Sequence, residues 1–108
     1  MKFTIQYTQR ADNDIFEQVD WWARNYSPEQ AVSWEAVVRQ QIDSLITLPE
    51  RHAFAPETSK FPFDVRQMLV GPGPRPSFRA VYTVRDSTVV VLTIQSGARD
   101  DLRLADLM

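Results

Sequence analysis

The chain of 108 residues is predicted to fold as an α+β domain: an N-terminal strand, a helical hairpin, then a three-stranded antiparallel meander, all strands forming one sheet. Three observations predict this order. Apolar and polar residues alternate near the N-terminus, apolar residues recur every three or four positions through two central stretches, and Val, Thr and aromatic residues dominate the later segments. With 44% hydrophobic residues, the length suits a single domain over residues 1–108 with one core.

The first segment has the pattern of a half-buried strand. Phe3, Ile5 and Tyr7 are apolar and the residues between them are polar, which predicts a strand over residues 2–8 with one buried face. The same alternation differs from the continuous apolar run of a signal peptide, and nowhere do 18 apolar residues follow one another. We therefore expect a cytoplasmic protein without a membrane segment.

Two helices are predicted next, joined by a short link that makes them an antiparallel hairpin. The first spans residues 12–25 with Asp12 as its N-cap. The second spans residues 28–48, because Ser27 is a favoured N-cap and Pro28 suits the first helical position, and a proline at 49 ends it. Their apolar stripes, together with the last strand, give the expected core: Ile15, Val19, Trp22, Trp34, Val38, Ile42, Leu45, Val91 and Leu92.

The rest of the chain is predicted to form a connection followed by three strands. Residues 49–63 contain three prolines without a sustained period, which indicates a surface connection. Strands are predicted over residues 64–70, 78–84 and 88–95, separated by turn-forming residues. The run 89–92 is apolar on both faces and predicts a central strand.

The composition excludes several kinds of site. The chain has no Cys and one His, which excludes disulfides, thiol catalysis and Cys-based metal sites, and we expect no metal and no cofactor. His52 stands in a polar, proline-bounded loop and is interpreted as a solvated histidine. Gly71-Pro72-Gly73 lacks the Lys-Ser/Thr pair and the helix of a phosphate-binding loop, so it is interpreted as a hairpin loop.

The formal charge of -2 conceals an uneven distribution. Residues 10–51 hold eight acidic and four basic side chains, whereas residues 60–99 hold six basic and two acidic ones. Arg66 and Arg79 lie within predicted strands, and Arg99 follows the last strand. Either strand arginine alone fits an ordinary solvent-exposed face, but all three on one rim would bind phosphate or carboxylate.

One aromatic residue stands apart from the predicted apolar stripe of the first helix. Trp21 is rotated about 100° from that stripe, which makes it a candidate anchor for a partner protein. Packing against the 49–63 connection is the alternative.

Several short segments, in this order, resemble the ParE/RelE toxin superfamily of type II toxin–antitoxin systems, which are associated with plasmid stabilization. They are 11–15, 27–31, 48–51, 65–70, 78–82, 89–92 and the Gly-x-Arg segment at 97–100. The resemblance spans about residues 3 to 102. It implies a bacterial toxin bound by a cognate antitoxin, and we expect a hydrophobic groove along the helical layer and an exposed strand edge for that partner.

Two activities occur in this superfamily. The RelE-like branch cleaves mRNA on the ribosome, and the resemblance implies that it would use Arg66, Arg79 and Arg99 on the RNA, together with a Tyr or His after the Gly-x-Arg segment. The tail 101–108 contains neither Tyr nor His. The ParE-like branch inhibits DNA gyrase by protein contact and needs no catalytic acid or base, so we favour a non-enzymatic gyrase inhibitor. An endoribonuclease and a non-toxic binding relative are the alternatives.

Overall fold

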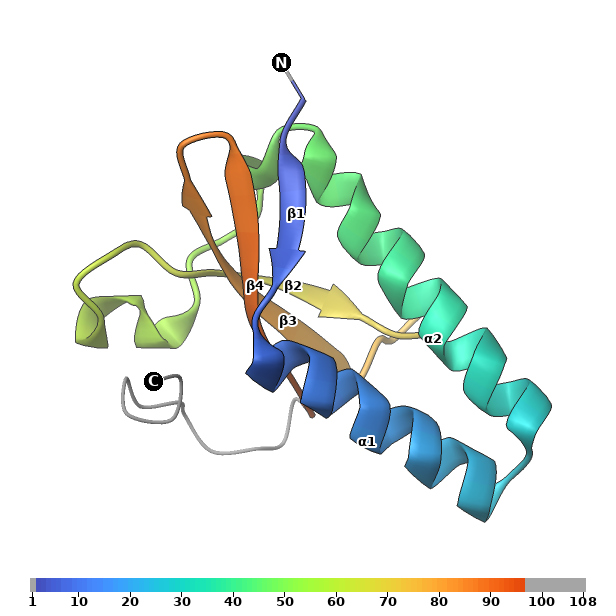
Figure 1. The fold of residues 1–108 in the computed structure, drawn as a ribbon. Helices are drawn as coiled ribbons and strands as arrows, with labels where there is room; N and C mark the ends of the chain where they lie inside the picture. The colour runs from blue at the N-terminus through green and yellow to red at the C-terminus, as the bar shows by residue number, and fades with distance from the viewer. Residues whose placement is uncertain (1, 97–108) are drawn as a thin grey trace.

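A computed structural model describes residues 2–96 and shows two helices packed on one face of a single sheet (Figure 1). The main elements are β1 (Thr4–Tyr7), α1 (Gln9–Asn25), α2 (Pro28–Asp43), β2 (Arg66–Val70), β3 (Phe78–Arg85) and β4 (Thr88–Ser96). Short 3-10 turns lie between α2 and β2: η1 (Ser44–Ile46), η2 (Pro49–Arg51) and η3 (Pro56–Lys60). No helix among the described residues is long and apolar enough to cross a membrane.

The sheet has the strand order β1-β4-β3-β2. β2, β3 and β4 form the antiparallel meander that the sequence predicts, and β1 pairs with β4 in parallel. β4 therefore has a strand on each side, which confirms the central position predicted from its doubly apolar run. Within the described sheet β1 has a neighbouring strand on one side only, so it provides the exposed edge that we expected.

The start of α1 differs from the prediction. Thr8, and not Asp12, is the N-cap: its hydroxyl accepts a hydrogen bond from the Ala11 amide at 3.0 Å and donates one to the Leu92 carbonyl at 2.8 Å. The helix consequently begins at Gln9, because the bond to β4 holds its first turn against the sheet. Asp12 lies within that first turn, where its negative charge interacts favourably with the positive end of the helix dipole.

The second helix begins as predicted and ends earlier. The Ser27 hydroxyl accepts a hydrogen bond from the Gln30 amide at 3.1 Å, and Pro28 is the first helical residue. The α-helix ends at Asp43 and tightens into η1, so the predicted end at 48 is wrong by about one turn. Leu48 then takes a left-handed conformation, with φ of 49°, and the chain turns away from the helix axis.

The core has two parts, one on each face of the sheet. Two of the predicted core residues, Val19 and Trp22, are partly exposed and pack against the core between helices and sheet. Six others are buried in that core: Ile15, Trp34, Val38, Ile42, Leu45 and Val91. Leu92 belongs instead to a smaller cluster with Phe61 and Val81 on the opposite face. Alternation along β4 explains this difference, because successive residues of a strand point to opposite faces, so Val91 faces the helices while Val90 and Leu92 face the other side.

The connection 49–63 is more ordered than a plain surface loop. The Ala55 amide donates to the Val65 carbonyl at 2.8 Å and the Gln67 amide to the Ala53 carbonyl at 3.1 Å, so this part of the connection pairs with the outer edge of β2. Phe61 is buried against the sheet. The connection thus covers the second face of the sheet, opposite the helices.

Candidate partner-binding site

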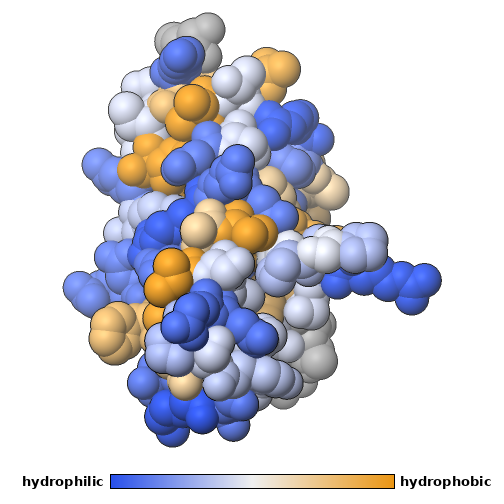
Figure 2. All heavy atoms as spheres, turned by 90° about the vertical axis from the view of Figure 1, so that its right-hand side faces the viewer, coloured by the Kyte–Doolittle hydropathy of each residue, from blue (hydrophilic) through white to orange (hydrophobic). Residues whose placement is uncertain are grey.

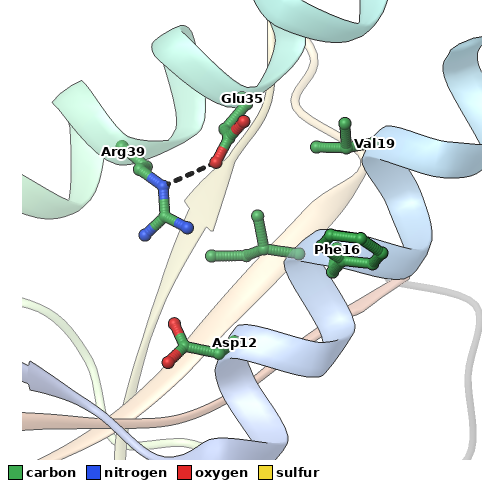
Figure 3. A pocket seen from close by; sticks show the side chains of 6 residues that line it. Asp12, Phe16, Val19, Glu35 and Arg39 are labelled. Atoms are coloured by element: carbon green, nitrogen blue, oxygen red, sulfur yellow. Dashed lines mark hydrogen bonds and ion pairs between the residues drawn. The ribbon is translucent and has the colours of Figure 1, made fainter.

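A groove of about 360 Å³ lies between α1 and α2, along the helical layer where we expected a hydrophobic groove, but three of its six lining residues are charged. Figure 3 shows that side chains of both helices line it. Figure 2 views the molecule from the side of these helices and shows several separate apolar patches among hydrophilic surface. The lining residues are Asp12, Ile15, Phe16 and Val19 of α1, with Glu35 and Arg39 of α2.

The apolar part of the groove comes from the stripe that packs α1 on the sheet. Ile15 is buried, whereas Phe16, the next residue around the helix, has 75% of its surface exposed. Full burial of a large apolar side chain contributes about 1.5 to 3 kcal/mol of favourable free energy. Phe16 forgoes most of this contribution in the isolated protein. Phe16 therefore marks this groove as a surface on which a partner gains stability by covering it.

The polar part of the groove is an ordered set of charges. The Arg39 guanidinium donates to the Glu35 carboxylate at 2.9 Å and lies 5.0 Å from the centre of the Tyr7 ring. Burial lowers the pKa of Arg39, but the hydrogen bonds and charge interactions with Glu35 and Tyr7 raise it by more, so the pKa lies above its usual value. Asp12, from the opposite helix, forms no ion pair within the described residues. The groove thus offers a paired cation and an available carboxylate beside apolar surface.

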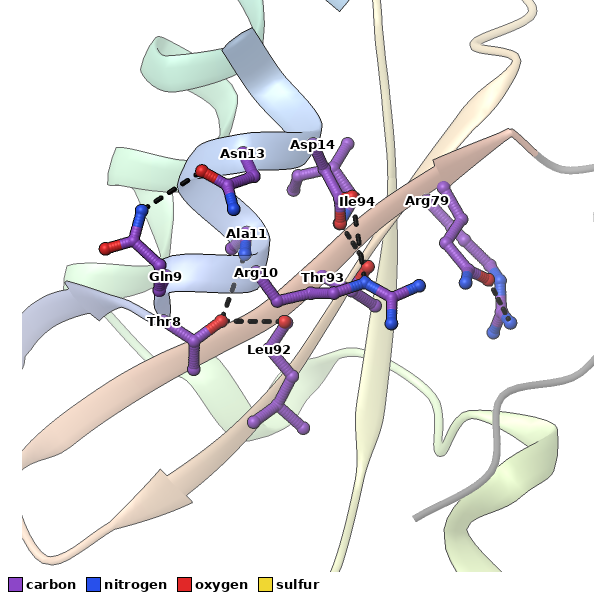
Figure 4. A network of polar contacts seen from close by, with 11 residues as sticks. Thr8, Gln9, Arg10, Ala11, Asn13, Asp14, Arg79, Leu92, Thr93 and Ile94 are labelled. Carbon is purple, nitrogen blue, oxygen red and sulfur yellow. Dashed lines mark hydrogen bonds and ion pairs between the residues drawn. The ribbon is translucent and has the colours of Figure 1, made fainter. Parts of the chain in front are cut away.

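Hydrogen bonds to β4 fix α1, and with it the groove, on the sheet (Figure 4). The buried Asp14 carboxylate accepts from the Ile94 amide at 3.0 Å and from the Thr93 hydroxyl. Arg10 lies 3.7 Å from the same carboxylate, one helical turn away. These bonds satisfy a charged group that would otherwise be costly to bury.

Arg79 lies on the opposite face of the sheet, in a buried ion pair. Its guanidinium donates to both oxygens of the Glu57 carboxylate, one of them at 2.9 Å, to Gln67 at 2.9 Å and to Gln95 at 3.2 Å. Glu57 is fully buried in η3, and Arg79 is 8% exposed. The pair therefore attaches the 49–63 connection to the sheet.

The structure does not bring the strand arginines together on one rim. Arg66 donates to the His52 carbonyl at 2.6 Å and lies 4.2 Å from the centre of the Phe54 ring. Its neighbour Gln67 binds Arg79, and successive residues of a strand point to opposite faces. The two guanidiniums therefore face opposite sides of the sheet, which corrects the expected cluster, and Arg99 lies outside the described residues.

Comparison with known proteins identifies the family. Residues 5–101 match the model of the ParE toxin of the type II toxin–antitoxin system parDE. The chain belongs to the ParE toxin family. A solved structure of a chromosomal ParDE toxin–antitoxin system from P. aeruginosa has the same fold, with a TM-score of 0.71 and 22% sequence identity over 88% of this chain and 96% of that chain. No curated protein sequence matches the chain.

In this ParE family member, sequence reasoning missed a cluster beside Arg66. The Tyr82 hydroxyl donates to the Pro49 carbonyl, and the Tyr82 ring meets His52 edge-on with centres 6.5 Å apart. Burial raises the pKa of Tyr82 to about 12, although the charge of Arg66 opposes the shift. The sequence feature that could have indicated this cluster is Tyr82, a polar aromatic residue at a buried position of β3. The phenol is held protonated and out of solvent, as a structural group.

His52 of this ParE family member lies in a bend of the connection and is only partly exposed to solvent. Its Nε2 atom is buried and has no hydrogen-bond partner within the described residues. Burial lowers its pKa, and the positive charge of Arg51 lowers it further. The prediction of a solvated histidine therefore holds only in part, because the connection folds back over β2 and β3 and covers one ring nitrogen, which the local sequence does not reveal.

Trp21 is exposed near the end of α1, as its position off the apolar stripe predicted. The side chain is 42% exposed and stands edge-on to Trp22, with ring centres 5.3 Å apart, and 5.7 Å from the ring of Tyr26. Its aromatic neighbours therefore come from its own end of the hairpin. The exposed part of the ring remains available for contact with a partner of this ParE family member.

Proposed function

We propose that this protein is the toxin of a type II toxin–antitoxin module, that it inhibits DNA gyrase by protein contact, and that a cognate antitoxin neutralises it. Membership of the ParE toxin family supports the toxin role. The observation that carries the choice of gyrase over RNA is the buried pair of Arg79 with Glu57. An arginine committed to a carboxylate inside the protein is a poor ligand for an RNA phosphate.

The other groups near the strand arginines favour the same choice. Cleavage of RNA by its own 2'-hydroxyl needs one group to take a proton and another to give one. Tyr82 is buried, donates to a carbonyl and has a pKa of about 12, and the imidazole Nε2 of His52 is buried. Neither side chain, as placed, exchanges protons readily with a bound substrate.

The groove between α1 and α2 is the proposed docking site for the antitoxin. An amphipathic segment would cover the exposed Phe16 ring and present a basic side chain to Asp12. Burial of the exposed three quarters of that residue favours binding by about 1 to 2 kcal/mol. Trp21 and Arg66 are the proposed contacts with gyrase or with a further part of the antitoxin, because both are accessible in part.

Induction of the protein in growing bacteria tests this function. DNA and protein synthesis are followed by incorporation of labelled thymidine and labelled methionine, and plasmid supercoiling is followed on gels. We expect DNA synthesis to fall and plasmids to relax before protein synthesis changes. Early arrest of translation, with discrete cuts in ribosome-bound mRNA on primer extension, would establish the endoribonuclease instead. Unimpaired growth would establish a non-toxic relative.

A further inference from the structure

Both walls of the groove between the helices carry exposed apolar surface. Phe16 of α1 is 75% exposed, and Val32 of α2 is 67% exposed. Val32 precedes Glu35 by three positions and Arg39 by seven, a spacing that places all three on one side of the helix. Because Glu35 and Arg39 line the groove, Val32 continues the α2 wall towards the end of the hairpin. A partner that lies along the groove would cover both apolar side chains.

The same groove contains a charged donor and a charged acceptor that do not pair with each other. Figure 3 shows Arg39 and Asp12 on opposite walls, near the same end of the groove. The Nε atom of Arg39 donates to Glu35, and a guanidinium has several other N–H donors. The Arg39 side chain is 38% exposed, and Asp12 forms no ion pair within the described residues. One surface of the protein therefore presents both halves of an ion pair.

This surface is complementary to a second copy of itself. A two-fold axis along the groove places α1 of each copy on α2 of the other, as in an antiparallel four-helix bundle. Asp12 of each copy then faces Arg39 of the other, because both residues lie near the same end of the groove. One helical turn further along, Phe16 of each copy lies against the α2 wall of the other. The arrangement pairs both charges and covers both exposed rings.

The area of the helical face fits a weak dimer. The 16 residues of α2 make a helix about 24 Å long, and two packed helices present a face about 20 Å wide. Two copies together would cover about 1,000 Å², which is the lower limit for a specific interface. Residues 10–51 hold eight acidic and four basic side chains, and this excess of negative charge opposes association.

We propose that two copies of this protein associate through their α1–α2 faces when no other partner covers the groove, with an Asp12–Arg39 ion pair at each end of the interface. The dissociation constant expected from the area is about 10 to 100 µM. Under the proposed function the antitoxin docks in the same groove, so the antitoxin and the second copy compete. The dimer itself rests on the geometry of the groove and not on gyrase inhibition, so its failure would leave the proposed function standing.

Sedimentation equilibrium of the purified protein, from about 1 to about 300 µM, tests the proposal. We expect a reversible equilibrium between monomer and dimer. Phe16→Ser should weaken dimerisation at least about tenfold, because each dimer covers two of these rings. Leu69→Ser is the matched control, since it removes an exposed apolar side chain from the second face of the sheet, and it should leave the dimer unchanged.

Charge reversal tests how the two copies are oriented. Asp12→Lys and Arg39→Glu each place like charges at both contacts, so each variant alone should associate at least about tenfold more weakly. An equimolar mixture of the two variants should dimerise again. In the mixed dimer one contact joins the two substituted side chains, and the other contact keeps Asp12 with Arg39. Circular dichroism of each variant checks that it is folded.

Three outcomes would overturn the proposal. They are a wild-type protein that remains monomeric at the highest concentration, a dimer that Leu69→Ser weakens as much as Phe16→Ser does, and folded charge variants whose mixture does not associate. Arg39 also holds Glu35, so Arg39→Glu carries some risk to the fold. If this variant does not fold, the comparison of Phe16→Ser with Leu69→Ser decides the question.

Discussion

The buried pair of Glu57 and Arg79 allows a prediction about stability. Replacing Glu57 by Leu leaves the Arg79 guanidinium, 8% exposed, without its carboxylate beneath a covered face of the sheet. Removing one partner of a buried ion pair costs about 3 to 5 kcal/mol. For a domain of this size that loss lowers the melting temperature by more than about 10 °C.

The double variant Glu57→Leu/Arg79→Met is expected to recover much of the lost stability. Replacing a whole buried pair by apolar side chains is often neutral, so the effects of the two substitutions should differ from additivity by about 2 kcal/mol or more. Urea unfolding followed by circular dichroism gives the four free energies of the cycle. The control Arg85→Met, at an exposed position of the same strand, should change stability by less than about 0.5 kcal/mol.

Two results would refute this reasoning. One is a loss below about 1 kcal/mol for Glu57→Leu, which would mean that the pair is not buried in solution. The other is strict additivity in the cycle. The folded double variant also separates structure from function, because gyrase inhibition should persist in it if Arg79 only attaches the connection to the sheet.

Four further variants test other parts of the structure. Phe16→Ser should weaken a purified complex with the antitoxin at least about tenfold by calorimetry, whereas Leu69→Ser, exposed on the second face of the sheet, should not. Trp34→Ala should cost about 3 to 5 kcal/mol in urea unfolding, and a loss below about 1 kcal/mol would remove it from the core. Asp14→Ala should cost about 1 to 3 kcal/mol by leaving a buried amide unpaired, and equal stability would contradict its bonds to β4. Because burial lowers the pKa of His52, the unfolded chain binds the imidazole proton more tightly than the folded protein does, and the free energy of unfolding should fall as the pH drops below about 6.5. His52→Gln should remove that part of the pH dependence. An unchanged pH profile in this variant would contradict the prediction.

Local sequence signals predicted much of the fold because short-range physics determines those features. The Ser27-Pro28 pair starts α2 through bonds within one turn, and alternation alone places β1. Other features depend on contacts between distant residues. The N-cap of α1 is set by a bond between Thr8 and Leu92, which no local pattern reveals.

The candidate site was predictable only in part, for the same reason. The sequence predicted apolar surface along the helices, but the packing of α1 on α2 determines that Phe16 is exposed while Ile15 is buried. The sequence suggested a cluster of arginines because it shows where the charged residues are along the chain but not which face of the sheet each side chain is on. Their separation follows from the register of β2 with β3 and from Glu57, 22 positions from Arg79, in a connection without regular periodicity.

A supercoiling assay with purified gyrase, relaxed plasmid and ATP tests the central claim most directly. We expect the purified protein to inhibit supercoiling in a concentration-dependent manner, and the double variant Glu57→Leu/Arg79→Met to inhibit equally. Full gyrase activity at a large molar excess of folded protein would contradict the claim.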